Sequence, residues 1–400
     1  MSQKKPRIVI VDALRGFALL GIILIHSIEH FDFFYPPELN YLFSPALDGF
    51  VFETIFLLIA GKAYSIFALM FGFSFFIQMD RQKQLGIDFR AQFIWRLFIL
   101  MGLGFVHSLF YEGDILHIYA ILGMSLVLFD RFKTKHLIII AGLLALQIPT
   151  LVQLTVSLLN PNYIFQETFG AGLWGIGSEI FAKGSFFEVI EYNNWRARTA
   201  VWGWTFYNGR YLMLIALFIF GLVLGREQFF HKLKENKKTL EKIALITFVF
   251  SVVIIQFKTL LITLPLGETQ SYFLNVLLGA YTSFTHTFFI FSVFCLIYIK
   301  FSKAKAFNYL AVYGRMSLSN YAGQSMIGVF IFYGYGLGMY RFMGSSWSLI
   351  YGILFFILQV SFSQFWMRNY YYGPLEWLWR ALTQLDFSIP LKRKTINSKT

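Results

Sequence analysis

Three ionisable residues lie inside a long apolar stretch near the start of the sequence. Residues 9–29 read VIVDALRGFALLGIILIHSIE and contain Asp12, Arg15 and His26. A charged side chain is costly inside a bilayer, so such residues usually face a protein interior or an aqueous cavity and mark a functional path. At about 100° per residue, all three fall on one helix face, with Arg15 and His26 about 16 Å apart along the axis. The pattern predicts a polar stripe that links the inner half of the membrane to its outer surface.

A second histidine is followed by carboxylates. Residues 104–116, GFVHSLFYEGDIL, include His107, Glu112 and Asp114. A carboxylate beside a histidine fixes the tautomer of the ring and stabilises the imidazolium, which is what a general base needs. His26 and His107 are therefore the candidate catalytic bases, and Asp114 is the group predicted to orient the histidine. The competing interpretation is that each histidine only donates a hydrogen bond between packed helices.

Arginines near the inner surface are suited to binding phosphates. Asp12 and Arg15 are close enough in sequence to pair, which lowers the cost of burying either charge. Residues 314–325, GRMSLSNYAGQS, add Arg315, Asn320 and Gln324. Because a guanidinium binds phosphate oxygens through paired hydrogen bonds, Arg15 and Arg315, together with Arg96, are the predicted phosphate ligands. Asp12, Asn320 and Gln324 complete the predicted cofactor-binding residues. The sequence contains no Walker motif or glycine-rich phosphate loop, so nucleotide hydrolysis has little support.

Cysteine and histidine usage argues against a metal centre. Cys295 is the only cysteine, which excludes an internal disulfide and a thiolate metal cluster. His26 and His30 are four residues apart, but no third ligand is evident. The sequence therefore predicts no metal site.

The composition is that of a membrane protein. Hydrophobic residues make up 57% of the chain and charged residues only 14%, against roughly 25% charged residues in soluble domains. The formal net charge of +13 comes from short basic clusters between apolar runs, as expected for cytoplasmic loops. No basic face with a nucleic-acid recognition motif is present in the sequence, so the bilayer is the predicted partner and nucleic acid is not.

Ten hydrophobic segments account for the apolar runs. They cover about residues 8–28, 51–79, 91–110, 115–130, 137–158, 210–225, 243–265, 271–299, 316–334 and 347–367. Basic residues flank these segments on one side, which the positive-inside rule assigns to the cytoplasm. The predicted fold is an all-α, polytopic membrane helix bundle with about ten transmembrane helices and both termini in the cytoplasm.

One segment on the predicted outer side is too long for a passive connection. Residues 159–209 are too polar to span, yet they are rich in Trp, Tyr and Phe. They predict either an aromatic belt at the membrane surface or a lid over an outward-facing site, with Arg196, Arg198 and Arg210 available to a substrate. The chain is therefore divided into an N-terminal membrane region (1–158), this loop or lid (159–209) and a C-terminal membrane region (210–400).

Six sequence motifs, spread over nearly the whole chain, carry a family resemblance. They are DALRG at residues 12–16, GKAYSIFALMFGF at 61–73, GFVH at 104–107, GDIL at 113–116 with Tyr119 and Ala120, GRMSLSNYAGQ at 314–324 and GPLEWLWRALT at 373–383. In these motifs the chain resembles the YeiB-like family of bacterial membrane proteins, whose C-terminal half is a domain of unknown function, number 418.

This resemblance extends at the first helix to transmembrane acyltransferases, including the acyltransferase 3 group and the lysosomal heparan-alpha-glucosaminide N-acetyltransferase. The acyltransferase 3 group carries an Arg, ten residues, then a His, which correspond here to Arg15 and His26. The resemblance implies that acetyl-CoA enters from the cytoplasm and that the acyl group passes to an acceptor on the far side. Some YeiB-like and lysosomal relatives have Asn in place of His26, which makes His107 the rival candidate for the base.

The predicted function is that of an integral acyltransferase of the bacterial cytoplasmic membrane. Arg15 and Arg315 would bind the phosphates of acetyl-CoA or another acyl-CoA, and a histidine would deprotonate a small-molecule or glycan acceptor. A transporter with a buried proton path is the main alternative, and a structural or sensory membrane protein is the third. The prediction also leaves room for a homodimer.

Overall fold

The computed structural model describes residues 7–33, 44–160, 162–170, 172–261 and 265–393. The terminal stretches 1–6 and 394–400, predicted to be cytoplasmic, lie outside the described residues. Within the described residues the chain is all-α, as predicted, apart from an isolated bridge between Tyr370 and Lys392.

The helices follow one another along the chain with short connections. They are α1 (Val9–Ile28), α2 (Pro45–Ile59), α3 (Lys62–Lys83), α4 (Arg90–Ser108), α5 (Leu116–Gly123), α6 (Ser125–Phe129), α7 (Thr134–Ala145), α8 (Ile148–Leu159), α9 (Leu173–Lys183), α10 (Phe186–Tyr192), the π-helical turn η1 (Asn193–Ala197), α11 (Arg198–Tyr207), α12 (Arg210–Arg226), α13 (Lys237–Leu261), α14 (Glu268–Phe301), α15 (Lys305–Arg315), α16 (Ser317–Phe332), the 3₁₀ turn η2 (Met339–Arg341), α17 (Ser345–Asn369) and α18 (Pro374–Gln384).

Seven helical stretches among the described residues are long and apolar enough to cross a membrane, or eight if the bent pair Phe186–Tyr207 and Arg210–Arg226 counts as one span. The chain is therefore a multi-pass membrane protein. The other predicted spans, at 115–130, 210–225 and 316–334, form the shorter helices α5–α6, α12 and α16. Each of these helices is shorter than the roughly 20 residues that a straight span needs, so none of them counts as a candidate span on its own.

The second predicted span, at 51–79, lies within one candidate span (Pro45–Lys83), which a turn divides into α2 and α3. Gly61, between α2 and α3, has a φ of +79°, a left-handed conformation that glycine adopts without steric cost. A Cβ at this position would also lie 2.8 Å from the hydroxyl of Ser283. Lys62, the first residue of α3, is consequently buried at the break.

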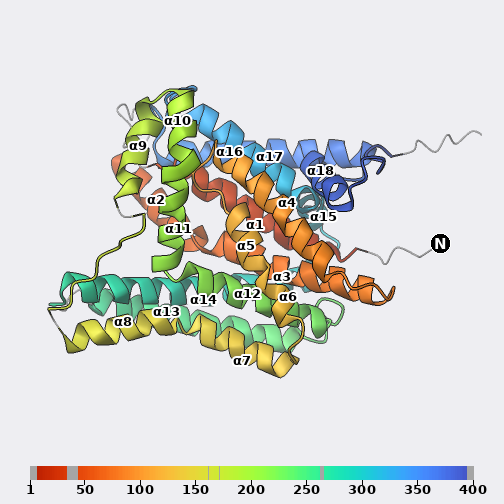
Figure 1. Cartoon of the computed structure of the whole chain (residues 1–400), viewed down its shortest axis with the longest axis horizontal. Helices are drawn as coiled ribbons and strands as arrows, with labels where there is room; N and C mark the ends of the chain where they lie inside the picture. Colours follow the sequence, from red (N-terminus) through yellow and green to blue (C-terminus); the bar gives the residue numbers. More distant parts are fainter. Residues whose placement is uncertain (1–6, 34–43, 161, 171, 262–264, 394–400) are drawn as a thin grey trace, which may run out of the picture.

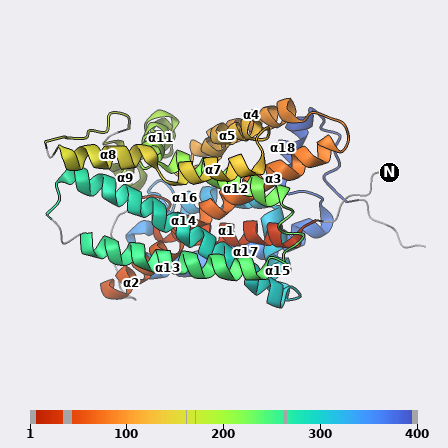
Figure 2. The ribbon, with the colours of Figure 1, turned by 90° about the horizontal axis from the view of Figure 1, so that it is seen from below.

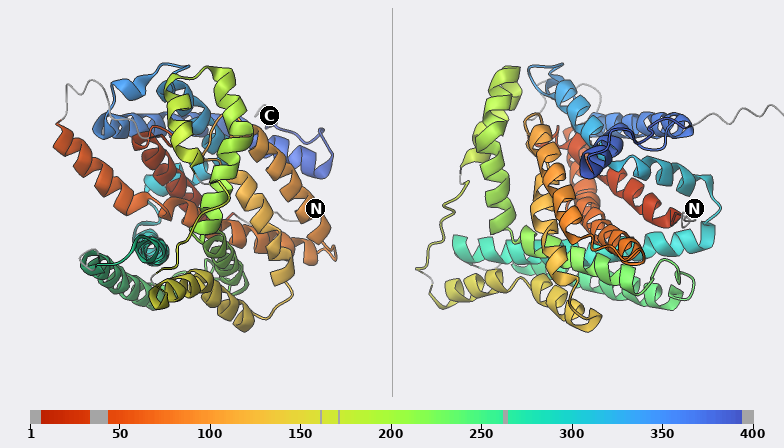
Figure 3. Two further views of the ribbon diagram at one scale, coloured as in Figure 1. Left: turned by 60° about the vertical axis from the view of Figure 1, so that its left-hand side comes forward. Right: turned by 45° about the vertical axis from the view of Figure 1, so that its right-hand side comes forward.

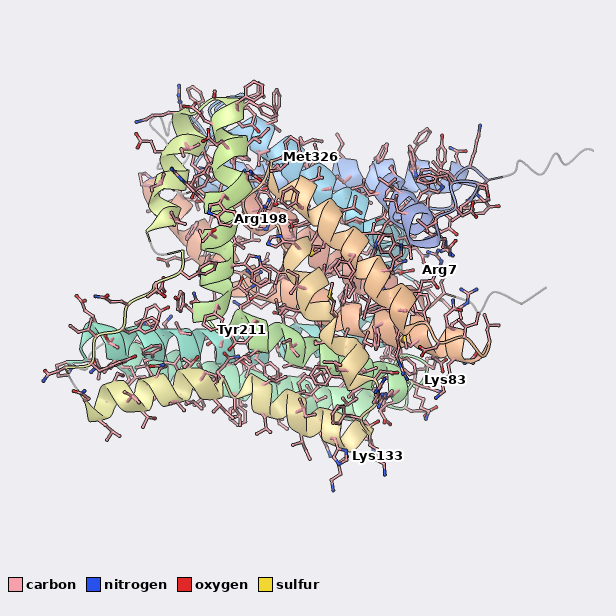
Figure 4. The ribbon with its side chains drawn as sticks, in the orientation of Figure 1. Arg7, Lys83, Lys133, Arg198, Tyr211 and Met326 are labelled. Atoms are coloured by element: carbon pink, nitrogen blue, oxygen red, sulfur yellow. The ribbon has the colours of Figure 1, made fainter. Side chains whose placement is uncertain are left out.

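Long apolar helices lie side by side along the long axis of the molecule. Figures 1 and 2 show α7, α8, α13 and α14 forming one such layer. Figure 4 places Arg7, Lys83 and Lys133 toward the same end of this axis. The grouping agrees with the one-sided distribution of basic residues in the sequence, and we call this end the basic end.

The predicted lid folds into α9, α10 and α11, which run across the long helices (Figures 1 and 3). Two side chains tie this crosswise segment to the end of α4. Asn193 Nδ2 donates a hydrogen bond to the carbonyl of Leu109 at 3.1 Å, and Arg198 Nη2 donates to Ser108 Oγ at 2.9 Å. The segment therefore covers the end of α4 that is remote from the basic end.

Glycines bring α1 into direct backbone contact with α15. α1 is the most buried of the seven candidate spans. A Cβ at Gly16 would lie 2.1 Å from the carbonyl oxygen of Leu310, and one at Gly314 would lie 2.0 Å from that of Asp12. Small residues allow this approach between membrane helices, which accounts for Gly16 of the DALRG motif and for Gly314, the first residue of GRMSLSNYAGQ.

Replacing Gly314 with alanine should lower stability by about 1–3 kcal/mol, because the added methyl group forces α1 and α15 apart. The melting temperature of the detergent-purified protein measures this loss. The matched control is Gly102→Ala in α4, where a Cβ meets no atom within 4 Å. Equal melting temperatures for the two variants would contradict the contact.

Candidate functional site

A cavity of about 1220 Å³ lies beside α1. One stripe of α1 lines it, from Ile8 through Asp12 and Arg15 to Ile22, which is about 21 Å of helix. Residues of α3, α4, α15, α16 and α18 form other parts of the wall. Because pockets for drug-sized ligands measure roughly 300–1,000 Å³, this cavity has room for an extended cofactor.

The cavity wall carries an excess of positive charge. Its six arginines are Arg7, Arg15, Arg81, Arg96, Arg315 and Arg380. Its three acidic residues are Asp12, Asp80 and Glu376. The excess favours a ligand that carries several negative charges.

Arg15 is fixed in place but retains free donors. Its Nη1 donates to Asp12 Oδ1 at 2.9 Å, and its Nη2 donates to Ser74 Oγ on α3. The side chain is still 25% exposed and lines the cavity. A guanidinium has five N–H donors, so Arg15 can bind a further anion without giving up these partners.

Glu376 caps the start of α16 and forms no ion pair with an arginine among the described residues. Its Oε1 accepts hydrogen bonds from the backbone amides of Leu318 at 2.6 Å and Ser319 at 3.1 Å. Nearby, burial and the charge of Arg7 lower the pKa of Arg315 to about 10, so Arg315 stays protonated at neutral pH. Its Nε has no hydrogen-bond partner among the described residues.

Tyr321 stands between the cavity and a histidine cluster. The backbone amide of Ile115 donates to Tyr321 Oη at 3.2 Å, and both residues line the cavity. The centroid of the Tyr321 ring lies 5.2 Å from that of His107. His107 itself is not among the residues that line the cavity.

Asp114 holds two histidines at once. Its Oδ1 is 2.7 Å from His107 Nδ1, and its Oδ2 is 2.9 Å from His117 Nδ1. Asp114 is fully buried, and its Oδ2 also accepts from the backbone amide of Leu116 at the start of α5. The close contact between α4 and the start of α5 requires Gly104 of the GFVH motif, since a Cβ there would lie 2.7 Å from the His117 backbone nitrogen. We call His107, Asp114 and His117 the Asp114 cluster.

The Asp114 cluster is arranged to accept protons. Burial alone would raise the pKa of Asp114, but its hydrogen bonds with His107 and His117 lower it to about 2. The ionised carboxylate can only accept, so each Nδ1 carries a hydrogen and each Nε2 of a neutral ring is left with a lone pair. Both Nε2 atoms are buried and have no partner within the described part of the chain.

His26 belongs to a second group, which we call the Asp32 cluster: His26, Glu29 and Asp32. His26 Nδ1 lies 3.3 Å from Asp32 Oδ1 and 3.7 Å from Glu29 Oε2. Burial and the negative charge of Asp32 raise the pKa of Glu29 to about 8, whereas His26 lowers the pKa of Asp32 against the effect of burial. Tyr111 joins the two clusters, since its Oη is 2.9 Å from His26 Nδ1 and its ring centroid is 5.8 Å from that of His107.

Most of the site residues predicted from the sequence fall into two separate groups in the structure. Asp12, Arg15 and Arg315 line the cavity, while His26, His107 and Asp114 lie beyond its far end. Asn320 and Gln324, predicted to bind a cofactor, are not among the lining residues.

The two amides instead lie inside the helix packing. Asn320 Nδ2 donates to the carbonyl of Tyr313 and to Ser363 Oγ, both at 3.0 Å, which ties α15, α16 and α17 together. Gln324 is buried, and its amide atoms have no partner among the described residues. Tyr321, on the same helix, is the residue of this motif that lines the cavity together with Arg315.

Some residues of the site were not singled out from the sequence. His117 follows Asp114 by three residues in GDILH, a spacing that lets a carboxylate at a helix start bond the side chain one turn later. Trp202 of α11 lies 5.8 Å from the His117 ring, so the crosswise segment covers this histidine. Arg210, predicted to meet a substrate, stacks on Tyr64 at 4.0 Å, and Arg196 is exposed.

Asp114→Asn should change the tautomer of one histidine while leaving the helices in place. The amide has one acceptor and one donor side, so one of His107 and His117 must accept a hydrogen bond at Nδ1 and carry its hydrogen on Nε2. Nitrogen-15 NMR of histidine-labelled protein distinguishes the tautomers. Asp88→Asn, at a carboxylate that is 68% exposed, is the control. Unchanged histidine spectra in Asp114→Asn would contradict the bridging geometry.

The chain has several relatives of nearly the same length. It is 27% identical to the uncharacterized protein YxaH of Bacillus subtilis (strain 168), over 99% of this chain and 100% of that protein. It is 27% identical to the uncharacterized protein YeiB of Escherichia coli (strain K12), over 94% and 96%. It is 25% identical to an uncharacterized 39.9 kDa protein in the amylase 3′ region of Bacillus acidopullulyticus, over 97% of each. Residues 224–386 match the model described as a protein of unknown function (DUF418). The C-terminal part of the chain thus matches the DUF418 model, and the whole chain is similar to YxaH and YeiB over nearly its full length.

Proposed function

We propose that the protein is an integral acyltransferase of the bacterial cytoplasmic membrane. It moves an acyl group from cytoplasmic acyl-CoA to an acceptor at the outer face. The observation that carries the proposal is the arginine-lined cavity that begins at the basic end and reaches Tyr321, beside the Asp114 cluster. In this topology all ten predicted segments cross or enter the bilayer, with the basic end and both termini in the cytoplasm.

The cavity supports an acyl-CoA better than a small neutral solute. Phosphates of the cofactor would bind Arg15, Arg315 and their neighbours at the basic end, where a guanidinium offers paired donors. The wall between Arg15 and Tyr321 contains apolar side chains such as Leu19 and Ile22. A pantetheine arm along this wall would bring the thioester to the boundary formed by Tyr321 and Ile115.

His107 is the residue we propose as the general base. Its Nε2 accepts the proton of the acceptor hydroxyl or amine as the acceptor's oxygen or nitrogen bonds to the thioester carbonyl carbon. The carbon–sulfur bond then breaks, and the CoA thiolate leaves and takes the proton back from His107. Asp114 fixes the tautomer and stabilises the imidazolium. His26 is the second candidate, but Tyr111 and Asp32 already engage it.

Arg15→Ala and Arg315→Ala should each weaken acetyl-CoA binding roughly 10- to 150-fold, the loss of a hydrogen bond to a charged group. Isothermal titration of the detergent-purified protein measures this. Arg131→Ala is the matched control, since Arg131 is exposed and does not line the cavity. Acetyl-pantetheine, which lacks the phosphates of the adenosine moiety, should bind weakly and equally to all variants. No binding of acetyl-CoA at millimolar concentration would count against the proposal.

His107→Gln should lower acyl transfer by about 10²- to 10⁴-fold while leaving acetyl-CoA affinity unchanged. Transfer is measured as radiolabel passing from acetyl-CoA to acceptors in membranes from the expressing bacteria. His26→Gln is assayed in parallel, and a loss confined to that variant would reassign the base. Solute uptake into proteoliposomes that forms no covalent product would contradict the enzyme proposal and support a transporter.

A further inference from the structure

The Asp32 cluster has the composition and spacing of a metal site. One ligand atom from each of His26, Glu29 and Asp32 can be chosen so that all three lie within 4.8 Å of one another. The pair His26 Nδ1 and Asp32 Oδ1 is 3.3 Å apart, and His26 Nδ1 and Glu29 Oε2 are 3.7 Å apart. Two ligands of one tetrahedral Zn²⁺ at its usual bond lengths are about 3.3–3.6 Å apart, so His26 is already close to the required distance from each carboxylate.

The backbone turns the three side chains toward one another. Glu29 follows His26 by three residues at the end of α1. His30, Phe31 and Asp32 then adopt φ values of 49°, 59° and 78°, which reverse the chain and return Asp32 to His26. His30, the partner that the sequence suggests for His26, is directed away, since its Nε2 donates to the carbonyl of Met343 at 2.8 Å.

More carboxyl groups gather at this place than the one imidazole of His26 can pair with. Glu29 and Asp32 both meet the one imidazole, and the other groups that act on Asp32 are the hydroxyl of Tyr111 and the charge of Arg210. Glu112 is only 3% exposed, and its Oε1 has no hydrogen-bond partner among the described residues. Buried carboxylates that lack partners are compensated in proteins by protonation or by a cation.

We propose that His26, Glu29 and Asp32 bind one divalent transition-metal ion, with Zn²⁺ as the best match. An imidazole nitrogen with two carboxylates suits Zn²⁺ rather than Mg²⁺, which prefers oxygen ligands and retains its waters. Three protein ligands leave the fourth position for a water or an acceptor oxygen, as in catalytic zinc sites. Tyr111, with its hydroxyl 2.9 Å from His26 Nδ1, is the neighbour placed to hydrogen-bond that fourth ligand or a bound carboxylate.

The site stands on its own geometry and does not depend on acyl transfer. If His26 is a metal ligand, its nitrogen is occupied and His107 is left as the base. If the protein binds metal but not acetyl-CoA, the metal site stands and the acyltransferase proposal is wrong. If it binds acetyl-CoA but no metal, the acyltransferase proposal stands and the metal site is wrong. The two proposals can therefore fail separately.

The experiment uses the full-length protein purified in detergent without chelators. Elemental analysis by inductively coupled plasma mass spectrometry should give about one zinc per chain. After treatment with a chelator and dialysis, titration with Zn²⁺ should restore one equivalent and raise the melting temperature. Asp32→Asn and His26→Gln should weaken Zn²⁺ binding at least tenfold and abolish the thermal shift. His136→Gln and Asp88→Asn are the controls, since both residues are exposed and lie outside the cluster.

Two outcomes would overturn the proposal. One is a protein that retains no zinc and shows no saturable Zn²⁺ binding, in which case a protonated His26 alone pairs with the carboxylates. The other is Zn²⁺ binding that survives in Asp32→Asn and His26→Gln but is lost in His136→Gln. Should the cluster variants fail to fold, zinc X-ray absorption of the unmodified protein decides, because the proposal requires a shell of one nitrogen and two or three oxygens at about 2.0–2.2 Å.

Discussion

The buried carboxylate of Asp114 is the interaction on which the candidate site depends. A fully buried charge is tolerated only when hydrogen bonds satisfy it, and here two histidine rings and the first amide of α5 do so. The same bonds fix both rings and join α4 to the start of α5. Gly104 permits the approach, because any side chain there would push the turn at residues 114–117 away from α4. One ionised group therefore determines both the local packing and the chemistry available to His107 and His117.

The remaining buried polar groups are divided between two regions with different chemistry. At the basic end, arginines face a wide cavity and suit an anion. Beyond Tyr321, histidines and carboxylates lie close together and suit proton transfer or a cation. Two tyrosines form the boundary, Tyr321 against His107 and Tyr111 between His107 and His26. The polar stripe of α1 thus meets both regions, with Arg15 in the first and His26 in the second.

The sequence alone could predict those features of the candidate site that follow from helix periodicity. Asp12 and Arg15 share a face of α1, and regular geometry carries that face along the cavity. The Asp32 cluster could not be read in this way, because it depends on left-handed backbone at His30, Phe31 and Asp32, which no residue type there requires. Asn320 lies outside the cavity wall for a related reason. It is one residue before Tyr321, so its side chain points into the packing of α15 and α17 rather than into the cavity.

The boundary between the two regions bears on the choice between transfer and transport. A transporter must let its whole solute pass, so its path has to open fully on each side in turn. A group-transfer enzyme needs only the reacting carbon of the donor and one atom of the acceptor to meet. The cavity wall includes Tyr321 and Ile115 but neither His26 nor His107, so the donor side stops within ring contact of the proposed base. A tyrosine ring in the cavity wall, with a histidine held by Asp114 immediately behind it, suits the passage of an acyl group better than that of an intact solute.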